Sequence, residues 1–216
     1  KAQFLVLELL RGEVGSTHFS NQSELDYWCD KLAVEGSRFG GREEPLGDSS
    51  HPAIAVNMAA CIQCTRCVRA CREEQANDVI GFANRGIRSE IIFDIKDPLG
   101  ESSCVGCGEC VQACPTGALM PSADAGLAAI DREVNSVCPY CGVGCLLTYH
   151  IKSNKIQYVT GRNGPSNHGR LCVKGRYGFD YVSHPDRIQH PLIRIEGIPK
   201  GLNEYFDPKQ PLKMFR

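Results

Sequence analysis

Twelve of the thirteen cysteines fall into three groups of four, and this spacing constrains the fold more than any other feature of the sequence. The groups are Cys61, Cys64, Cys67 and Cys71; Cys104, Cys107, Cys110 and Cys114; and Cys138, Cys141, Cys145 and Cys172. Cysteines two residues apart form disulfides poorly in regular backbone, whereas C-x2-C repeats are the usual geometry for binding a metal. The spacing therefore favours metal–thiolate sites over a disulfide scaffold, and such sites indicate a reducing compartment.

The first two groups have the spacing of a two-cluster ferredoxin. CVGCGECVQACP matches C-x2-C-x2-C-x3-C-P in full, and CIQCTRCVRAC differs only in having Arg72 where the proline stands. In this class the fourth cysteine of each run ligates the other cluster. The sequence thus predicts a first [4Fe-4S] site on Cys61, Cys64, Cys67 and Cys114, and a second site on Cys104, Cys107, Cys110 and Cys71. Two structural zinc sites are the alternative, but these usually use pairs of C-x2-C knuckles rather than triple runs.

The third group has a different spacing, C-x2-C-x3-C, and its last member, Cys172, follows Cys145 after 26 intervening residues. A cubane cluster needs only four thiolates that meet in space. Residues 146–152 and 155–160 alternate as strands and predict a hairpin around Ser153 and Asn154, which would return the chain to Cys172. We expect these four cysteines to form a third [4Fe-4S] site.

Composition excludes several kinds of partner. The 216 residues contain 24 basic and 25 acidic side chains, so the net charge of -1 gives no sign of nucleic acid or an anionic surface as a ligand. Apolar stretches such as FLVLELL fall well short of the roughly 20 residues that a membrane helix needs. We expect no nucleic acid, no membrane span and a cytoplasmic location. Neither a Walker A loop nor a glycine-rich dinucleotide fingerprint is present, so NAD would bind to another subunit.

Local patterns predict an α+β chain of short elements. Helices are expected at 2–10, at 23–35 with Ser23 as N-cap, at 68–75, and at 111–119 ending at its glycine. Strands are expected at 79–82 and 90–95, and a glycine-rich turn at 169–179. Residues 40–52 and the region near 121–134 read as linkers.

Three segments carry a resemblance to a known family. SVCPYCGVGC, GRNGPSNHGRLCVKGRYGFDYV and HPDRIQHPLIR resemble the amino-terminal cluster domain of molybdenum or tungsten bis-pterin oxidoreductases. They are most similar to the alpha subunit of NAD-dependent formate dehydrogenases, and the two ferredoxin-like runs resemble the module that such subunits carry just upstream.

The resemblance implies a specific organisation. A partial N-terminal helical segment with a linker would occupy 1–51, and a ferredoxin-type domain with two [4Fe-4S] clusters would occupy 52–121. After a linker at 122–134, a β-rich [4Fe-4S] domain of the Mo/W-bis-MGD type would occupy 135–191. Residues 192–216 would begin the pterin-binding region, and we expect the chain to be part of a longer polypeptide.

The resemblance also implies a function. Formate would be oxidised to CO2 at a Mo- or W-bis-molybdopterin guanine dinucleotide centre, whose cysteine or selenocysteine ligand lies beyond residue 216. The three clusters would pass the electrons to partner subunits that bind flavin and NAD. No catalytic residue is expected in this chain, but Lys174, two residues after Cys172, would help relay electrons between pterin and cluster. Without the resemblance, Lys174 reads as a surface lysine.

One departure from the family concerns the N-terminal segment. Many relatives hold a further cluster there on one histidine and three cysteines, whereas this chain offers only His18 and Cys29. We interpret residues 1–40 as a remnant without metal, with Cys29 as a buried packing residue.

Two alternatives to the formate hypothesis remain open. The chain could be a stand-alone polyferredoxin, which explains the twelve cysteines but not GRLCVKGRYGFDYV. It could also belong to a related enzyme, such as the large cluster-bearing subunit of respiratory NADH dehydrogenase or an assimilatory nitrate reductase.

Overall fold

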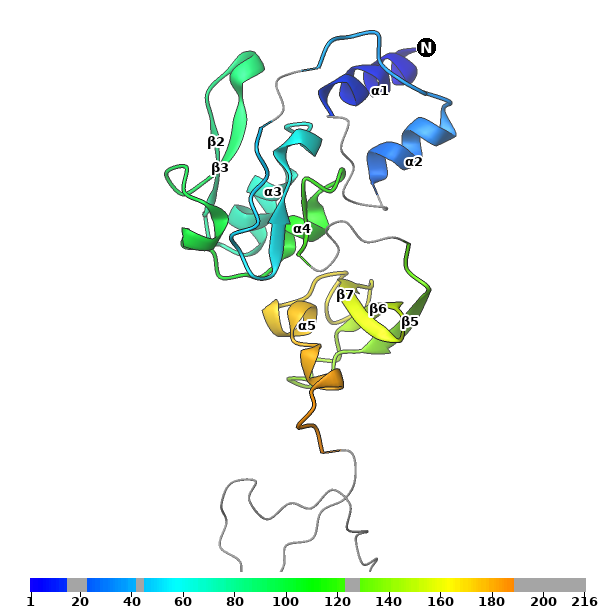
Figure 1. Cartoon of the computed structure of the whole chain (residues 1–216), viewed down its shortest axis with the longest axis vertical. Helices are drawn as coiled ribbons and strands as arrows, with labels where there is room; N and C mark the ends of the chain where they lie inside the picture. The colour runs from blue at the N-terminus through cyan, green and yellow to red at the C-terminus, as the bar shows by residue number, and fades with distance from the viewer. Residues whose placement is uncertain (15–22, 42–44, 123–128, 189–216) are drawn as a thin grey trace, which may run out of the picture. The chain divides into compact units, whose positions relative to one another are not determined.

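The computed structural model describes residues 1–14, 23–41, 45–122 and 129–188. Short helices alternate with three small antiparallel sheets, in agreement with the predicted α+β class (Figure 1). The elements are α1 (Ala2–Glu13), α2 (Glu24–Lys31), β1 (Ile54–Val56), η1 (Met58–Ala60), α3 (Arg66–Arg69), η2 (Ala70–Glu74), β2 (Ile80–Ala83), η3 (Gly86–Arg88), β3 (Glu90–Phe93), η4 (Leu99–Glu101), α4 (Glu109–Ala113), β4 (Leu119–Pro121), β5 (Arg132–Val137), β6 (Leu146–Lys152), β7 (Lys155–Gly161), α5 (Val173–Tyr177) and η5 (Asp180–Ser183). None of these helices combines the length and apolarity needed to cross a bilayer. His18 and the pterin-binding region expected from residue 192 lie outside the described residues.

Helices α1 and α2 form a small N-terminal cluster, against which Ile62 also packs. As predicted, Ser23 caps α2, because its side-chain oxygen accepts a hydrogen bond of 3.1 Å from the backbone N–H of Asp26. Cys29 is 3% exposed and packs with Leu25 and Val34. The prediction that Cys29 is a packing residue is therefore confirmed.

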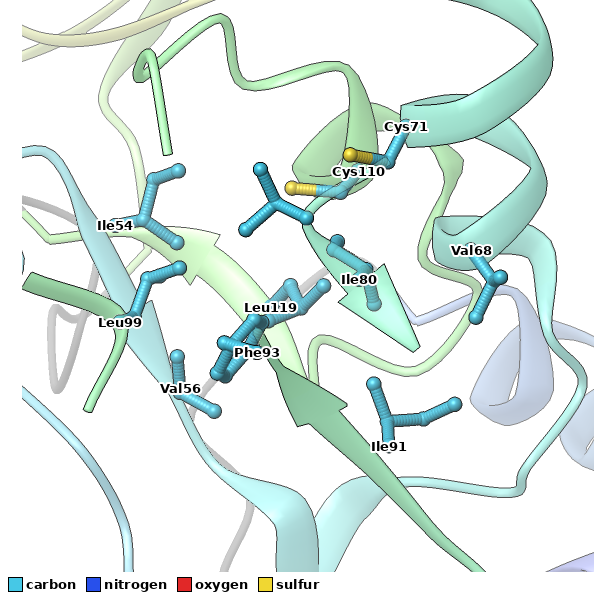
Figure 2. Packing of buried hydrophobic residues seen from close by; sticks show 11 residues of the cluster. Ile54, Val56, Val68, Cys71, Ile80, Ile91, Phe93, Leu99, Cys110 and Leu119 are labelled. Atoms are coloured by element: carbon cyan, nitrogen blue, oxygen red, sulfur yellow. The ribbon is translucent and has the colours of Figure 1, made fainter. Parts of the chain in front are cut away.

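The middle of the chain is built around two strand pairs. β1 pairs with β4, so that Ile54 lies opposite Pro121, and β2 pairs with β3 as a hairpin. The apolar side chains between them, with Ile54 and Leu99 almost fully buried, form the largest core of the described residues. Figure 2 shows the sulfur atoms of Cys71 and Cys110 at one end of this core. Two of the predicted ligands are thus part of the packed interior.

Three predicted helices end or change earlier than expected. The helix expected at 23–35 ends at Lys31. The helix expected at 68–75 is α3 followed by the π-helical turn η2, which contains Cys71. The helix expected at 111–119 ends at Ala113 and not at its glycine, and that prediction was wrong. Cys114 has an extended backbone because Pro115 excludes the helical region for the residue before it.

The third sheet has the order β5-β6-β7. Ser153 and Asn154 connect β6 to β7 with φ values of 49° and 61°, which is the left-handed pair of a tight hairpin turn and confirms the predicted hairpin. Strand β5 was not predicted. The glycine-rich stretch after Cys172, expected as a turn, instead forms the short helix α5.

Candidate iron–sulfur sites

The structure brings together the four cysteines expected for the first site. One cavity is lined by Cys61, Cys64, Cys67 and Cys114, together with Met58, Ile62, Thr65, Ile91, Pro115, Thr116, Ala118 and Leu119. The loop that carries three of these thiols wraps tightly because Gln63 and Thr65 both have positive φ. The backbone N–H of Gln63 donates to the sulfur of Cys61 at 3.4 Å. Cys71, from the same sequence run, does not line this cavity.

A second cavity contains the other exchanged quartet. It is lined by Cys71, Cys104, Cys107 and Cys110, together with Asn77, Val79, Ile80, Leu99, Val105 and Gly108. The N–H of Gly106 donates to the sulfur of Cys104 at 3.4 Å, which repeats the contact found in the first run. The two loops are therefore related in geometry as well as in spacing.

In each cavity the four cysteines line a hollow and do not converge on one position. Among the described residues, no three His, Cys, Asp or Glu side chains converge closely enough to hold a single metal ion. Four thiols around an apolar cavity fit a cluster, which is larger than one ion and is ligated by four thiolates. The donor sets of both cavities therefore fit [4Fe-4S] clusters.

Burial makes two of these thiols weaker acids than an ordinary cysteine. It raises the pKa of Cys67 to about 12, with a further contribution from Cys61 and Cys114, and it raises the pKa of Cys110 well above the usual value. Since thiolates are the ligands, cluster assembly must release protons from these groups. The apolar surroundings disfavour the negatively charged thiolates, which are stabilised only when a metal cluster is bound.

The third quartet is held by the β5-β6-β7 domain. The N–H of Cys138 donates to the carbonyl of Cys145 at 2.8 Å, and Cys172 is the N-cap of α5. A Cβ added at Gly175 would lie 3.5 Å from the sulfur of Cys138, so α5 lies against this site. The pKa of Cys145 is raised by burial and by the charges of the other three thiols. All four predicted members are therefore near one another.

Asn167 links the two chain segments that carry ligands of this third site by hydrogen bonds. Its Nδ2 lies within 3.1 Å of the carbonyls of Leu146 and Arg162 and within 2.9 Å of that of Arg170. Its Oδ1 accepts from the N–H of Leu146 at 3.1 Å. Leu146 follows Cys145 and Arg170 shortly precedes Cys172, so one buried amide holds both ligand segments.

Helix α5 connects the third site to the second. Arg176 is 2% exposed, and its Nε donates to the carbonyl of Cys107 at 3.2 Å. Its Nη2 lies 3.5 Å from the carboxylate of Glu109, a buried residue of α4. Burial raises the pKa of Glu109, and the charge of Arg176 opposes that shift. Arg176, from the helix that follows Cys172 of the third site, is thus enclosed beside a ligand of the second site.

Tyr177 adds a polar group to the same place. Its hydroxyl is buried and, among the described residues, has no hydrogen-bond partner. Burial raises the pKa of Tyr177 most, and the thiols of Cys104, Cys107 and Cys110 raise it further. A buried donor beside three thiols fits a site that receives sulfur acceptors.

Gly108 makes this contact possible. Its φ is +73°, and an added Cβ would overlap Arg176 Cδ and Tyr177 Oη. We expect Gly108→Ala to destabilise the protein by about 2 kcal/mol or more, because left-handed backbone alone costs about 1 to 2 kcal/mol for a residue with a Cβ. Hydrogen exchange at the α5 amides should accelerate.

Gly86→Ala is the matched control for Gly108→Ala. Gly86 also has a positive φ, +61°, but nothing lies within 4 Å of its added Cβ. Equal exchange rates at α5 in both variants would contradict the steric part of the expectation.

Lys174 lies on α5, and its position is exposed. Its role as a relay stays a prediction. Among the residues that sequence reasoning missed are Gly108, Asn167, Arg176 and Tyr177. A signal for Arg176 was available in the four-residue step from Cys172, which places it one helical turn after a ligand.

Comparison with known domains identifies two segments. Residues 60–118 match the model of the 4Fe-4S dicluster domain, and residues 131–184 match that of the molybdopterin oxidoreductase Fe4S4 domain. The predicted presence of a ferredoxin-type iron–sulfur domain, followed by one of the molybdopterin-oxidoreductase type, is confirmed.

Two of the curated relatives and one of the solved structures that are similar to this chain illustrate its kinship. A subunit of an NADH-quinone oxidoreductase from Rhizobium meliloti is 37% identical over 150 residues, covering 68% of this chain and 17% of the relative. A protein named "Putative formate dehydrogenase" from Staphylococcus haemolyticus is 26% identical over 215 residues, covering 81% of this chain and 22% of the relative. The crystal structure of an NAD⁺-reducing NiFe-hydrogenase in the H2-reduced state has a TM-score of 0.54 and 23% identity, covering 61% of this chain and 58% of that one. The chain thus spans about a fifth of the length of these curated relatives.

Proposed function

We propose, from the two matched iron–sulfur domains and the three cysteine quartets, that this chain is the electron-transfer portion of a molybdopterin-dependent formate dehydrogenase. The observation that carries the proposal is the pair of cavities with exchanged cysteines, linked through α5 to a third quartet. Three one-electron carriers in succession form a wire, and this chain supplies their ligands and surroundings.

The residues have distinct roles in this wire. The first site would use Cys61, Cys64, Cys67 and Cys114; the second Cys104, Cys107, Cys110 and Cys71; and the third Cys138, Cys141, Cys145 and Cys172. When bound, each [4Fe-4S] cluster takes up and releases one electron. The backbone N–H groups of Gln63 and Gly106 donate toward ligand sulfurs and so stabilise negative charge there. Lys174, exposed beside the third site, would face the pterin of the complete protein.

Formate as the substrate and flavin- and NAD-binding partner subunits complete the proposal. The name of the staphylococcal relative, which aligns with 81% of this chain, supports formate. The names of the quinone oxidoreductase relative and of the NAD⁺-reducing hydrogenase support a nicotinamide-linked assembly. The Mo- or W-bis-pterin centre would lie in the part of the protein that follows this chain.

A second candidate is a subunit of the NADH-quinone oxidoreductase type. The 37% identity to the relative from Rhizobium meliloti favours it, because that value exceeds the 26% identity to the formate dehydrogenase relative. The polyferredoxin alternative is less well supported, since residues 131–184 match a molybdopterin-oxidoreductase domain.

The first test is the cluster content of the anaerobically purified chain. We expect about twelve irons and about twelve acid-labile sulfides per chain, with paramagnetic resonance signals of interacting [4Fe-4S] clusters after dithionite reduction. About eight irons would contradict one of the three sites, and zinc in place of iron would contradict the electron-transfer function.

The second test addresses the substrate. The full-length protein with its partner subunits should reduce NAD or a dye when formate is added. If it binds pterin but formate reduces neither acceptor, while NADH reduces the clusters, the formate assignment is wrong and the second candidate is favoured.

A further inference from the structure

We propose that Arg176 is the bridge through which electrons pass between the third site and the second site. This inference rests on the proposed electron-transfer function and adds to it the order of the sites and the residue that joins two of them. The order is third, second, first.

A short bonded path runs through this residue. The backbone N–H of Arg176 donates to the carbonyl of Cys172 at 3.0 Å, and its Nε donates to the carbonyl of Cys107 at 3.2 Å. The path from one cysteine to the other therefore consists of covalent bonds within one residue and two hydrogen bonds. It begins at a predicted ligand of the third site and ends at one of the second.

The surroundings hold this path in one geometry. Arg176 is 2% exposed, and the absence of a side chain at Gly108 leaves room for its Cδ. Glu109 lies 3.5 Å from the guanidinium and balances its charge. Side-chain motion and water at this position are thereby restricted.

Neighbouring contacts point to the same pair of sites. Gln112 of α4 bonds to the backbone of Gly169 and accepts from the N–H of Gly161 at 3.4 Å. Arg170 forms ion pairs with Glu109 and with Glu74. Glu74, Glu109 and Gln112 belong to η2 and α4, the elements that carry Cys71 and Cys110 of the second site. The segment that holds the third site thus contacts the ferredoxin-type module at the second site.

The arginine side chain suits a transfer of electrons alone. Arginine stays protonated in proteins, so no proton needs to move through it. In the transfer step the third site loses one electron and the second site gains one, and no covalent bond is made or broken. The positive charge also stabilises the additional negative charge of the reduced second site.

Arg176→Met and Arg176→Lys in the full-length protein distinguish the effect of the hydrogen-bonded path from the effect of the positive charge. For Arg176→Met, the reduction potential of the second cluster should fall by about 59 mV, so that the ratio of reduced to oxidised cluster at a fixed potential falls about tenfold. This shift is the one expected for the loss of one charge about 10 Å away at an effective dielectric constant of about 20. The rate of transfer from third to second cluster, followed by rapid freeze-quench paramagnetic resonance, should fall about tenfold as well. For Arg176→Lys the potential should stay near the wild-type value, because the positive charge is kept. The rate should remain low, because lysine lacks the guanidinium Nε that donates to the carbonyl of Cys107.

Matched variants exclude a merely structural role. Arg170→Lys alters another arginine that faces Glu109 but keeps its positive charge, and it should leave the rate unchanged. Arg176→Met combined with Glu109→Gln removes the uncompensated buried carboxylate, and its transfer should still be slow.

Wild-type rates in Arg176→Lys, or in any Arg176 variant that keeps all its iron, would overturn the bridge. Should Arg176→Met fail to fold, Arg176→Lys carries the test by itself. Dithionite, NADH or formate can serve as the reductant, so the bridge is tested even if formate is not the substrate. Wild-type protein with fewer clusters would instead contradict the proposed function.

Discussion

Replacing Cys71 with serine is expected to remove the second cluster and to leave the first, although Cys71 belongs to the same eleven-residue run as three first-site cysteines. The reason is geometric, since Cys71 lines the cavity of Cys104, Cys107 and Cys110. Cys114→Ser should have the reciprocal effect, because Cys114 lines the cavity of the first run. Each change should lower the iron content by about four atoms per chain.

A chain that already lacks the first site makes this test sharp. Cys61→Ser with Cys64→Ser should retain about eight irons. Adding Cys114→Ser to that background should cause no further loss, whereas adding Cys71→Ser should remove about four more. The opposite pattern would mean that each run binds its own cluster, and the exchanged assignment would be wrong.

Asn167→Ala is expected to empty the third site without touching any of its ligands. The substitution leaves the N–H of Leu146 and the carbonyls of Arg162 and Arg170 without their side-chain partner, whereas the carbonyl of Leu146 still accepts from the N–H of Arg162. Each buried unsatisfied group costs about 1 to 3 kcal/mol, so the segment that carries Cys172 should detach from Cys145. Iron analysis should show a loss of about four atoms, together with the resonance of one cluster.

Asn163→Ala provides the control for Asn167→Ala. Asn163 lies in the same loop but is exposed, and its replacement should leave the iron content unchanged. Asn167→Asp keeps the acceptor and loses the donor, so it should also lose the cluster, since a carboxylate would face three carbonyl oxygens. A full complement of iron in Asn167→Ala would show that the loop holds without this amide.

Spacing in the sequence was sufficient to predict the quartets that the structure gathers. The C-x2-C-x2-C-x3-C runs carry their information locally, and the β6-β7 hairpin is encoded by alternating residues around Ser153 and Asn154. The helix expected to reach the glycine of CPTG ends at Ala113, because Pro115 disfavours helical backbone at the residue before it.

Contacts between distant segments were beyond sequence reasoning. Arg176 becomes important only when α5 packs on Gly108, 68 positions earlier in the sequence. Likewise Glu8 is buried because Arg38 binds its carboxylate through Nε at 2.6 Å and Nη2 at 2.8 Å, a pairing between separate segments that no local pattern encodes. In both cases the partner is set by tertiary packing.

The exchange of cysteines between the two runs has a consequence for biosynthesis. Each cavity takes three thiols from one run and one from the other, so a nascent chain completes the second cavity only when Cys110 has left the ribosome, and the first only when Cys114 has. Iron delivered earlier would meet three thiols and an open coordination position. Insertion of both clusters is therefore a late, joint event, and the order in which the ribosome releases the runs does not decide which is filled first.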